Sequence, residues 1–127
     1  MCPISRTVII VDDNGAVGSA LKYAFEAEGF RGEVYARARD LLAEATLPRN
    51  SCLVIDYLMP EMDGIELLCA LRQRQIDLPA ILITTGVHIG LREHAADAGF
   101  HAVIEKPLSD DSLLDTVRFV LDLACND

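Results

Sequence analysis

Hydrophobic residues along this chain gather in four short runs that predict β-strands. The runs are Val8–Val11, Leu53–Ile55, Ala80–Ile83 and Ala102–Ile104. None of them alternates cleanly between apolar and polar residues, which is typical of strands that helices cover on both faces. A fifth and weaker strand is predicted at Arg31–Tyr35.

Between the strands, apolar residues recur with the period of an α-helix, and this period predicts five helices. The first has Val17, Leu21, Ala24 and Phe25 on one face and ends at Gly29, and the second has Leu41, Leu42 and Ala45 and stops at Pro48. The third has Ile65, Leu68 and Leu71 and ends before Pro79, and the fourth covers Leu91 and residues 95–98 and ends at Gly99. The fifth starts at Ser109, Asp110 and Asp111, whose side chains suit free backbone N–H groups, and its apolar face is Leu113, Val117, Leu121 and Ala124.

The alternation of strand and helix predicts a single α/β domain over residues 1–127. Five repeats of this alternation, without a linker, imply a parallel sheet with right-handed crossovers and helices on both sides. Sites in such folds form outside the carboxyl ends of the strands. The residues at those ends are therefore the first candidates for chemistry.

Polar residues follow four of the predicted strands. They are Asp12 and Asp13, Asp56, Thr84, and Lys106. Each alone is weak evidence, because an Asp or Thr at a strand end is usually a turn or cap residue. In a parallel sheet, however, the four strand ends share one edge, so we expect three acids, a hydroxyl and an amine to converge.

Clustered carboxylates repel one another unless a cation lies among them, and a small set of protein oxygens suits Mg²⁺. An ionised Asp56 beside a magnesium ion can attack a phosphoryl group as a carboxylate nucleophile. Lys106 and Thr84 can supply the positive charge and the hydroxyl that the phosphoryl oxygens need. The set indicates acyl-phosphate chemistry on Asp56.

The chain resembles the receiver domains of bacterial two-component response regulators. The matching segments are VDDN at 11–14, DYLMPEMDG at 56–64, ITTG at 83–86 and EKP at 105–107. The matching segments, in this order and spacing, cover essentially the whole chain. The sequences TTG and AGFHAVIEKPLSDDSLL most resemble those of receivers that precede a helix-turn-helix output domain. The resemblance implies a flavodoxin-like, CheY-like (βα)5 fold, doubly wound, with strand order 2-1-3-4-5.

The resemblance also implies a role for each candidate residue. Asp56 is expected to be the phosphoacceptor, and Mg²⁺ is expected to bind Asp13, Asp56 and the backbone carbonyl of Leu58, with Asp12 acting partly through water. Lys106 is expected to pair first with Asp56 and then with the phosphoryl group, and Thr84 to donate its hydroxyl to that group. The Lys106-Pro107 peptide is expected to be cis, and Gly64 to let the loop after Asp56 turn tightly.

These roles describe a signalling domain rather than an enzyme that acts on other substrates. The expected phosphodonor is a histidine kinase or a phosphotransfer protein, and the expected result is a conformational switch that controls an output, transcriptional by resemblance. The surface of the fourth helix, fifth strand and fifth helix is expected to serve as the output face and a possible homodimer face. A stand-alone receiver, or a phosphate sink that regulates a partner by contact, is the alternative.

Other classes fit less well. Aspartyl-phosphate phosphatases tend to use a second acid two residues after the nucleophile, where this chain has Leu58. A module that never takes phosphate is at odds with the presence of all five polar residues. The chain also departs from many receivers at Val103, three residues before Lys106, where an aromatic residue is common. We expect Val103 to pack under the fourth helix without a comparable swing, since β-branched side chains are stiff.

Composition and charge limit the partners and the compartment. Hydrophobic residues make up 51% and charged residues 24% of the chain, and its formal net charge is -9. This negative charge argues against direct binding of nucleic acid or of an anionic membrane by this domain. The N-terminus lacks the form of a signal peptide, which favours the cytoplasm. Four cysteines without a CxxC pair are expected to be reduced and mostly buried.

Overall fold

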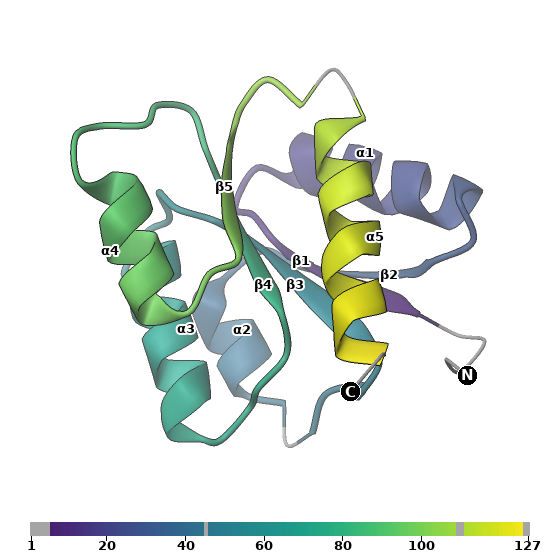
Figure 1. Ribbon diagram of the computed structural model, residues 1–127, viewed down its shortest axis with the longest axis horizontal. Coiled ribbons are helices and arrows are strands. Elements are labelled where there is room, and N and C mark those ends of the chain that lie inside the picture. The colour runs from purple at the N-terminus through teal and green to yellow at the C-terminus, as the bar shows by residue number, and fades with distance from the viewer. Residues whose placement is uncertain (1–5, 45, 109–110, 126–127) are drawn as a thin grey trace.

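A central sheet of five parallel strands organises the chain, with helices on both of its faces (Figure 1). The computed structural model describes residues 6–44, 46–108 and 111–125. The strands are β1 (Thr7–Val11), β2 (Arg31–Tyr35), β3 (Ser51–Asp56), β4 (Ala80–Thr84) and β5 (Ala102–Glu105). The helices are α1 (Gly15–Ala27), α2 (Ala38–Leu42), α3 (Gly64–Gln73), α4 (Leu91–Ala98) and α5 (Ser112–Cys125).

The strand order is β2-β1-β3-β4-β5, and every neighbouring pair is parallel. This confirms the (βα)5 doubly wound fold and the order 2-1-3-4-5. The two edge strands, β2 and β5, are only partly buried, whereas β1, β3 and β4 are buried throughout. The exposure of β2 explains why its sequence predicts a strand only weakly.

Two hydrophobic clusters lie on opposite faces of the sheet, because alternate strand residues point to opposite sides. One cluster contains Ile9 and Leu53 and packs against α2, α3 and α4. The other contains Ile10 and Val54 and packs against α1 and α5. Figure 1 shows the same division of the helices between the two faces.

Local signals in the sequence set the ends of several helices. The Asn14 side chain accepts hydrogen bonds from the backbone N–H groups of Ala16 and Val17 at the start of α1. Asp63 and Glu66 form a reciprocal capping box at the start of α3. Gly99 takes a left-handed φ of 113° after α4, a conformation that glycine adopts without strain.

The apolar face predicted for the first helix is only partly buried. Phe25 is buried, whereas Val17 and Leu21 are half-buried and Ala24 is exposed. Helix α1 instead presses Gly18 against β2, where a Cβ atom would lie 2.8 Å from Cγ1 of Val34. The residues left half-buried line a groove described below.

The remaining differences concern helix bounds and cysteines. Helix α2 covers residues 38–42, and Ala45 lies outside the described residues, as do Ser109 and Asp110 at the predicted start of the fifth helix. Cys52 is buried as expected, but Cys69 is exposed on α3. Within the described part of the chain, no helix is long and apolar enough to cross a membrane.

Candidate functional site

The carboxyl ends of β1, β3, β4 and β5 bring the candidate residues to one edge of the sheet. Val11 of β1 is paired with Ile55 of β3, so Asp12 follows beside Asp56. On the other side of the sheet centre, Thr84 of β4 is paired with Glu105 of β5, the residue before Lys106. The parallel register therefore places these strand ends level with one another, as the sequence predicted.

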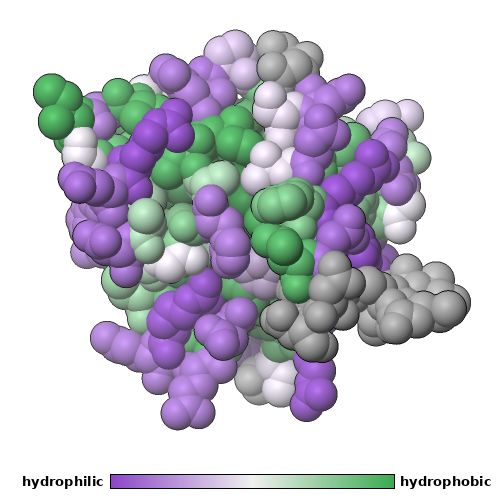
Figure 2. All heavy atoms as spheres, viewed as in Figure 1, coloured by the Kyte–Doolittle hydropathy of each residue, from purple (hydrophilic) through white to green (hydrophobic). Residues whose placement is uncertain are grey.

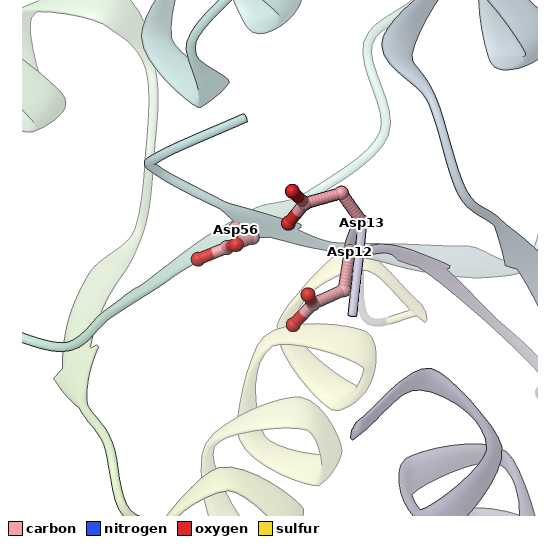
Figure 3. Close-up of side chains that lie close together, drawn as sticks. All are labelled: Asp12, Asp13 and Asp56. Carbon is pink, nitrogen blue, oxygen red and sulfur yellow. The ribbon is translucent and has the colours of Figure 1, made fainter. Parts of the chain in front are cut away.

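Three carboxylates converge at this edge. One oxygen each from Asp12, Asp13 and Asp56 lies within 4.8 Å of the other two, and Figure 3 shows the three side chains gathered around one space. Asp12 is fully buried and Asp56 is 5% exposed, whereas Asp13 is exposed. The cluster is thus anchored in the sheet on one side and open to solvent on the other.

Lys106 supplies the positive charge at the site. Its Nζ lies 3.0 Å from Oδ2 of Asp12 and 3.3 Å from Oδ1 of Asp56. The sequence predicted the pair with Asp56, but the shorter contact is with Asp12, whose other oxygen accepts the N–H of Asn14 at 2.9 Å. The Lys106-Pro107 peptide is cis, as predicted.

Burial and charge change the proton affinities of this group. The pKa of Asp56 is raised to about 6, chiefly by burial and also by the charges of Asp12 and Asp13, while Lys106 acts in the opposite direction. Burial lowers the pKa of Lys106, but the hydrogen bonds and charges of Asp12 and Asp56 outweigh it, so this pKa is raised overall. Lys106 therefore stays protonated, but its single positive charge does not keep the pKa of Asp56 at the ordinary value.

The donor set fits a hard divalent cation. Three ionised carboxylates carry three negative charges against the single positive charge of Lys106. Oxygen ligands on an open edge are what Mg²⁺ prefers, because this ion keeps part of its water shell. Asp13 is on the open side and can receive such an ion without a change in the buried part of the site.

The raised pKa of Asp56 predicts how stability depends on pH in the absence of metal. Between about pH 4 and pH 6 the folded chain holds a proton on Asp56 that the unfolded chain has lost, so the free energy of unfolding falls as pH rises through this window. In buffer with a chelator, an Asp56→Asn variant is expected to gain melting temperature over wild type, more at pH 7 than at pH 5. Thermal unfolding at both pH values measures this difference, and parallel pH curves for the two proteins would contradict it.

The Thr84 hydroxyl is buried beside the acids but faces its own loop. It donates a hydrogen bond to the carbonyl oxygen of Gly86 at 3.1 Å. A donation to a group bound on Asp56 therefore requires the loop after β4 to change. Thr84 is placed as predicted, and the bond to Gly86 was not foreseen.

Gly64 closes the loop after Asp56, as its N–H donates to the carbonyl oxygen of Tyr57 at 2.9 Å. Its φ is not in the left-handed region; in this loop the positive φ belongs to Glu61, at 74°. A Cβ atom on Gly64 would lie 2.6 Å from the backbone oxygen of Asp56 and 2.8 Å from Cδ1 of Leu82. Gly64 thus allows α3 to start in direct contact with the end of β3.

Four further features near the site were either expected or missed by the sequence analysis. Leu58 lies on the open rim with 61% of its surface exposed, and Val103 is buried in the cluster under α4, as expected. Asn14 and the ring contact between Tyr57 and His88 were missed by the sequence reasoning. The capping preference of Asn just before a helix could have revealed Asn14. Nothing local in the sequence indicates the ring contact.

An α/β fold with acids, a hydroxyl and an amine at the carboxyl edge of its sheet is the arrangement expected of a signalling receiver domain, and comparison with known proteins agrees. The chain belongs to the response regulator receiver domain family, whose model matches residues 8–118. Among its relatives is the transcriptional regulatory protein FixJ of Rhizobium meliloti (strain 1021), 36% identical over 112 residues that cover 88% of this chain and 55% of FixJ. The C4-dicarboxylate transport transcriptional regulatory protein DctD of Pseudomonas aeruginosa is 34% identical over 91% of this chain and 25% of DctD.

Solved structures agree with the sequence relatives. The crystal structure of FixJ-N superposes with a TM-score of 0.85 at 34% identity and covers 96% of each chain. A CheY-like receiver domain protein from Methanospirillum hungatei JF-1 superposes with a TM-score of 0.86 at 28% identity, over 95% of this chain and 97% of the other. The chain spans 55% of the length of FixJ and 25% of that of DctD.

Proposed function

We propose that this chain, residues 1–127, acts as one receiver domain that accepts a phosphoryl group on Asp56 in a Mg²⁺-dependent reaction and then changes conformation. The observation that carries the proposal is the placement of Asp56 beside two further acids and 3.3 Å from the Lys106 amine. Family membership supports the same function. The proposal keeps the predicted cytoplasmic location.

The transfer step follows from the groups at the site. An Asp56 carboxylate oxygen forms a bond to phosphorus, and the bond from phosphorus to a histidine nitrogen of the donor breaks, with its electron pair staying on the imidazole. Asp12, Asp13, Asp56 and the Leu58 carbonyl are the residues that would hold Mg²⁺, and the ion would neutralise charge on the phosphoryl oxygens. Lys106 pairs with one of those oxygens on the other side.

The new phosphoryl group biases an equilibrium between two conformations. It adds negative charge and acceptor oxygens beside Lys106 and Thr84. Thr84 then exchanges its bond to Gly86 for one to the phosphoryl group, and the loop between β4 and α4 moves with it. Since FixJ and DctD are named as transcriptional regulatory proteins, we propose a transcriptional output for the protein to which this domain belongs.

A small phosphodonor tests this proposal without the cognate kinase. The purified chain is incubated with acetyl phosphate and Mg²⁺, and its intact mass is measured over time. We expect a mass gain of one phosphoryl group that a chelator prevents. A chain that keeps its original mass with acetyl phosphate and with phosphoramidate would contradict the proposal.

An apolar groove beside the site supports a helical protein as the natural phosphodonor. A hollow of about 260 Å³ is lined by Val17, Ala20, Leu21, Lys106, Pro107 and Leu108. A second hollow, of about 150 Å³, shares Leu21 and Leu108 with the first and continues between α1 and α5. Lys106 belongs to both this groove and the acid site. A helix that lies in the groove can therefore bring a phosphorylated histidine close to the Asp56 carboxylate. We therefore propose a histidine kinase or phosphotransfer protein as the occupant.

Filling the groove is expected to slow transfer from the protein donor alone. An Ala20→Arg variant places a long side chain in the groove, so we expect about tenfold slower phosphorylation by the cognate kinase, the effect of losing about 1.4 kcal/mol of contact. Phosphorylation by acetyl phosphate is expected to stay at the wild-type rate. Ala27→Arg, on an exposed position of α1 outside the groove, is the matched control and should leave both rates unchanged. Equal slowing by both donors would place the defect at the acid site instead.

The surface of α4, β5 and α5 is the proposed output face and homodimer face. Phe119 is 63% exposed and Leu123 is 48% exposed on α5, at helical spacing. Figure 2, which views this side of the molecule, shows apolar side chains interspersed with polar ones. Exposed aromatic and aliphatic side chains on one helix are the usual anchors of a protein interface.

A further inference from the structure

Two aromatic side chains connect the loops on either side of the phosphoacceptor. The ring of Tyr57, directly after Asp56, lies 6.0 Å from the ring of His88, measured between centroids, with the planes at 39°. This separation is within the range in which aromatic pairs attract each other. His88 follows Thr84 by four residues, so the contact links the loop after β3 to the loop after β4.

Tyr57 is the fixed member of this pair. Its N–H donates to the carbonyl oxygen of Ile83 at 2.8 Å, and its carbonyl oxygen accepts from the N–H of Gly64 at 2.9 Å. Its side chain is half-buried against the cluster that includes Leu91 and Val103. The position of the Tyr57 ring is therefore set by the sheet and by the start of α3.

His88 is the member that can move. Its side chain is exposed, and its carbonyl oxygen accepts from the N–H of Leu91, the first residue of α4, at 3.1 Å. Gly90, between them, has a φ of 87°, a conformation that marks a sharp turn in the chain. A displacement of His88 is thus passed directly to the start of α4.

The hydrogen bond of the Thr84 hydroxyl couples this loop to the acid site. In this structure it is bonded to the Gly86 carbonyl, two residues before His88. When it turns to another acceptor, the segment from Gly86 to His88 loses the bond that holds it. The Tyr57–His88 contact and the partly buried side chain of Val87 then still tie the segment to the rest of the site.

Among the described residues, the other side chains near this loop make no aromatic ring contact with it. Val103 is buried under α4, and its carbonyl oxygen accepts from Arg92 at 2.9 Å, so it is part of the packing beneath the helix. Ile89, next to His88, is fully exposed to solvent. Within the described part of the chain, Tyr57 therefore supplies the ring contact of this loop.

We propose that Tyr57 and His88 form a latch that holds the loop between β4 and α4 in the resting arrangement, and that the latch opens when Asp56 carries a phosphoryl group. The inference rests on the proposed function, because it assigns the regulation of the same site. Both residues are positioning residues: they act on the equilibrium between the two conformations through the loop.

The strength of the latch can be measured with beryllofluoride, a stable analogue of the phosphoryl group, in the presence of Mg²⁺. Opening the latch consumes part of the binding free energy, so removing it should lower the half-saturating beryllofluoride concentration. We expect a decrease of about two- to tenfold for His88→Ala, the fold-change of an ordinary aromatic contact. Tyr57→Leu should give a similar decrease, and Tyr57→Phe, which keeps the ring, should resemble wild type.

A double-mutant cycle separates the latch from general effects of each substitution. The Tyr57→Leu/His88→Ala double variant should bind no more tightly than the tighter of the two single variants, since the shared contact can be lost only once. His94→Ala, at an exposed histidine on α4, is the matched control and should leave binding unchanged. Additive effects of the two single substitutions would overturn the latch.

Histidine NMR spectra provide a second readout. At pH 8, where an ordinary imidazole is neutral, the Tyr57 ring should shift the ring protons of His88 away from those of His94 and His101. Beryllofluoride should move the His88 signals toward their position in Tyr57→Leu. Beryllofluoride binding with unchanged His88 signals overturns the latch alone, whereas a wild-type chain that binds no beryllofluoride overturns the proposed function as well.

Discussion

An Asp56→Asn variant is expected to gain no phosphoryl group from any donor, while wild type gains one. The amide that replaces the carboxylate is not a nucleophile towards phosphorus, so the loss should be complete rather than partial. The fold should persist, because asparagine has the shape of aspartate and relieves the repulsion from Asp12 and Asp13 that helps to raise the pKa of Asp56. Intact mass after incubation with acetyl phosphate and Mg²⁺ measures the result.

The control for this variant is another aspartate outside the site. Asp97 is exposed on α4, and Asp97→Asn should be phosphorylated as wild type is. A melting temperature for Asp56→Asn at or above that of wild type in the absence of donor would show that the loss is not due to unfolding. A variant that still gains one phosphoryl group would mean that the acceptor is a different residue.

A Gly64→Ala variant is expected to lose more stability than other single-methyl changes at the glycines of this chain. Its added Cβ would meet the Asp56 backbone oxygen at 2.6 Å and the Ile55 side chain at 3.0 Å. Backbone cannot move aside as a flexible side chain can, so we expect a loss of about 1–3 kcal/mol in the free energy of unfolding. For a domain of this size, that loss lowers the melting temperature by roughly 4–12 °C.

Gly15→Ala is the matched control for this prediction. Gly15 is the first residue of α1, and a Cβ atom there would have nothing within 4 Å. Because alanine favours a helix more than glycine does, this variant should be as stable as wild type or slightly more stable. If Gly64→Ala unfolds at the same temperature as Gly15→Ala, the close contact between α3 and the Asp56 strand does not constrain the fold.

The fold could be predicted from the sequence because its signals are local and repeated. Short apolar runs such as Val8–Val11 leave few options other than buried parallel strands, and glycines such as Gly99 mark helix ends. The packing of α1 could not be predicted in this way. The period of its apolar residues indicates a face, but only the close approach of Gly18 to β2 determines how that face is turned.

The site was predicted as a set of residues together with the pair of Lys106 and Asp56, but its other internal contacts were not predicted. Parallel strand ends bring Asp12, Asp13, Asp56, Thr84 and Lys106 together in any chain of this topology. Which acid Lys106 approaches more closely depends on distances of a few tenths of an ångström, and no pattern of residue types determines them. The Tyr57–His88 contact likewise depends on two loops whose paths are not repetitive.

The most direct test of the central claim is to identify the residue that takes the phosphoryl group. The chain is phosphorylated with acetyl phosphate and Mg²⁺ and reduced with borohydride, which converts an aspartyl phosphate into homoserine, and its peptides are then sequenced by mass spectrometry. We predict homoserine at position 56, dependent on both donor and Mg²⁺, with Asp12 and Asp13 unmodified. Homoserine at another aspartate, or unmodified Asp56 in a phosphorylated chain, would contradict the account.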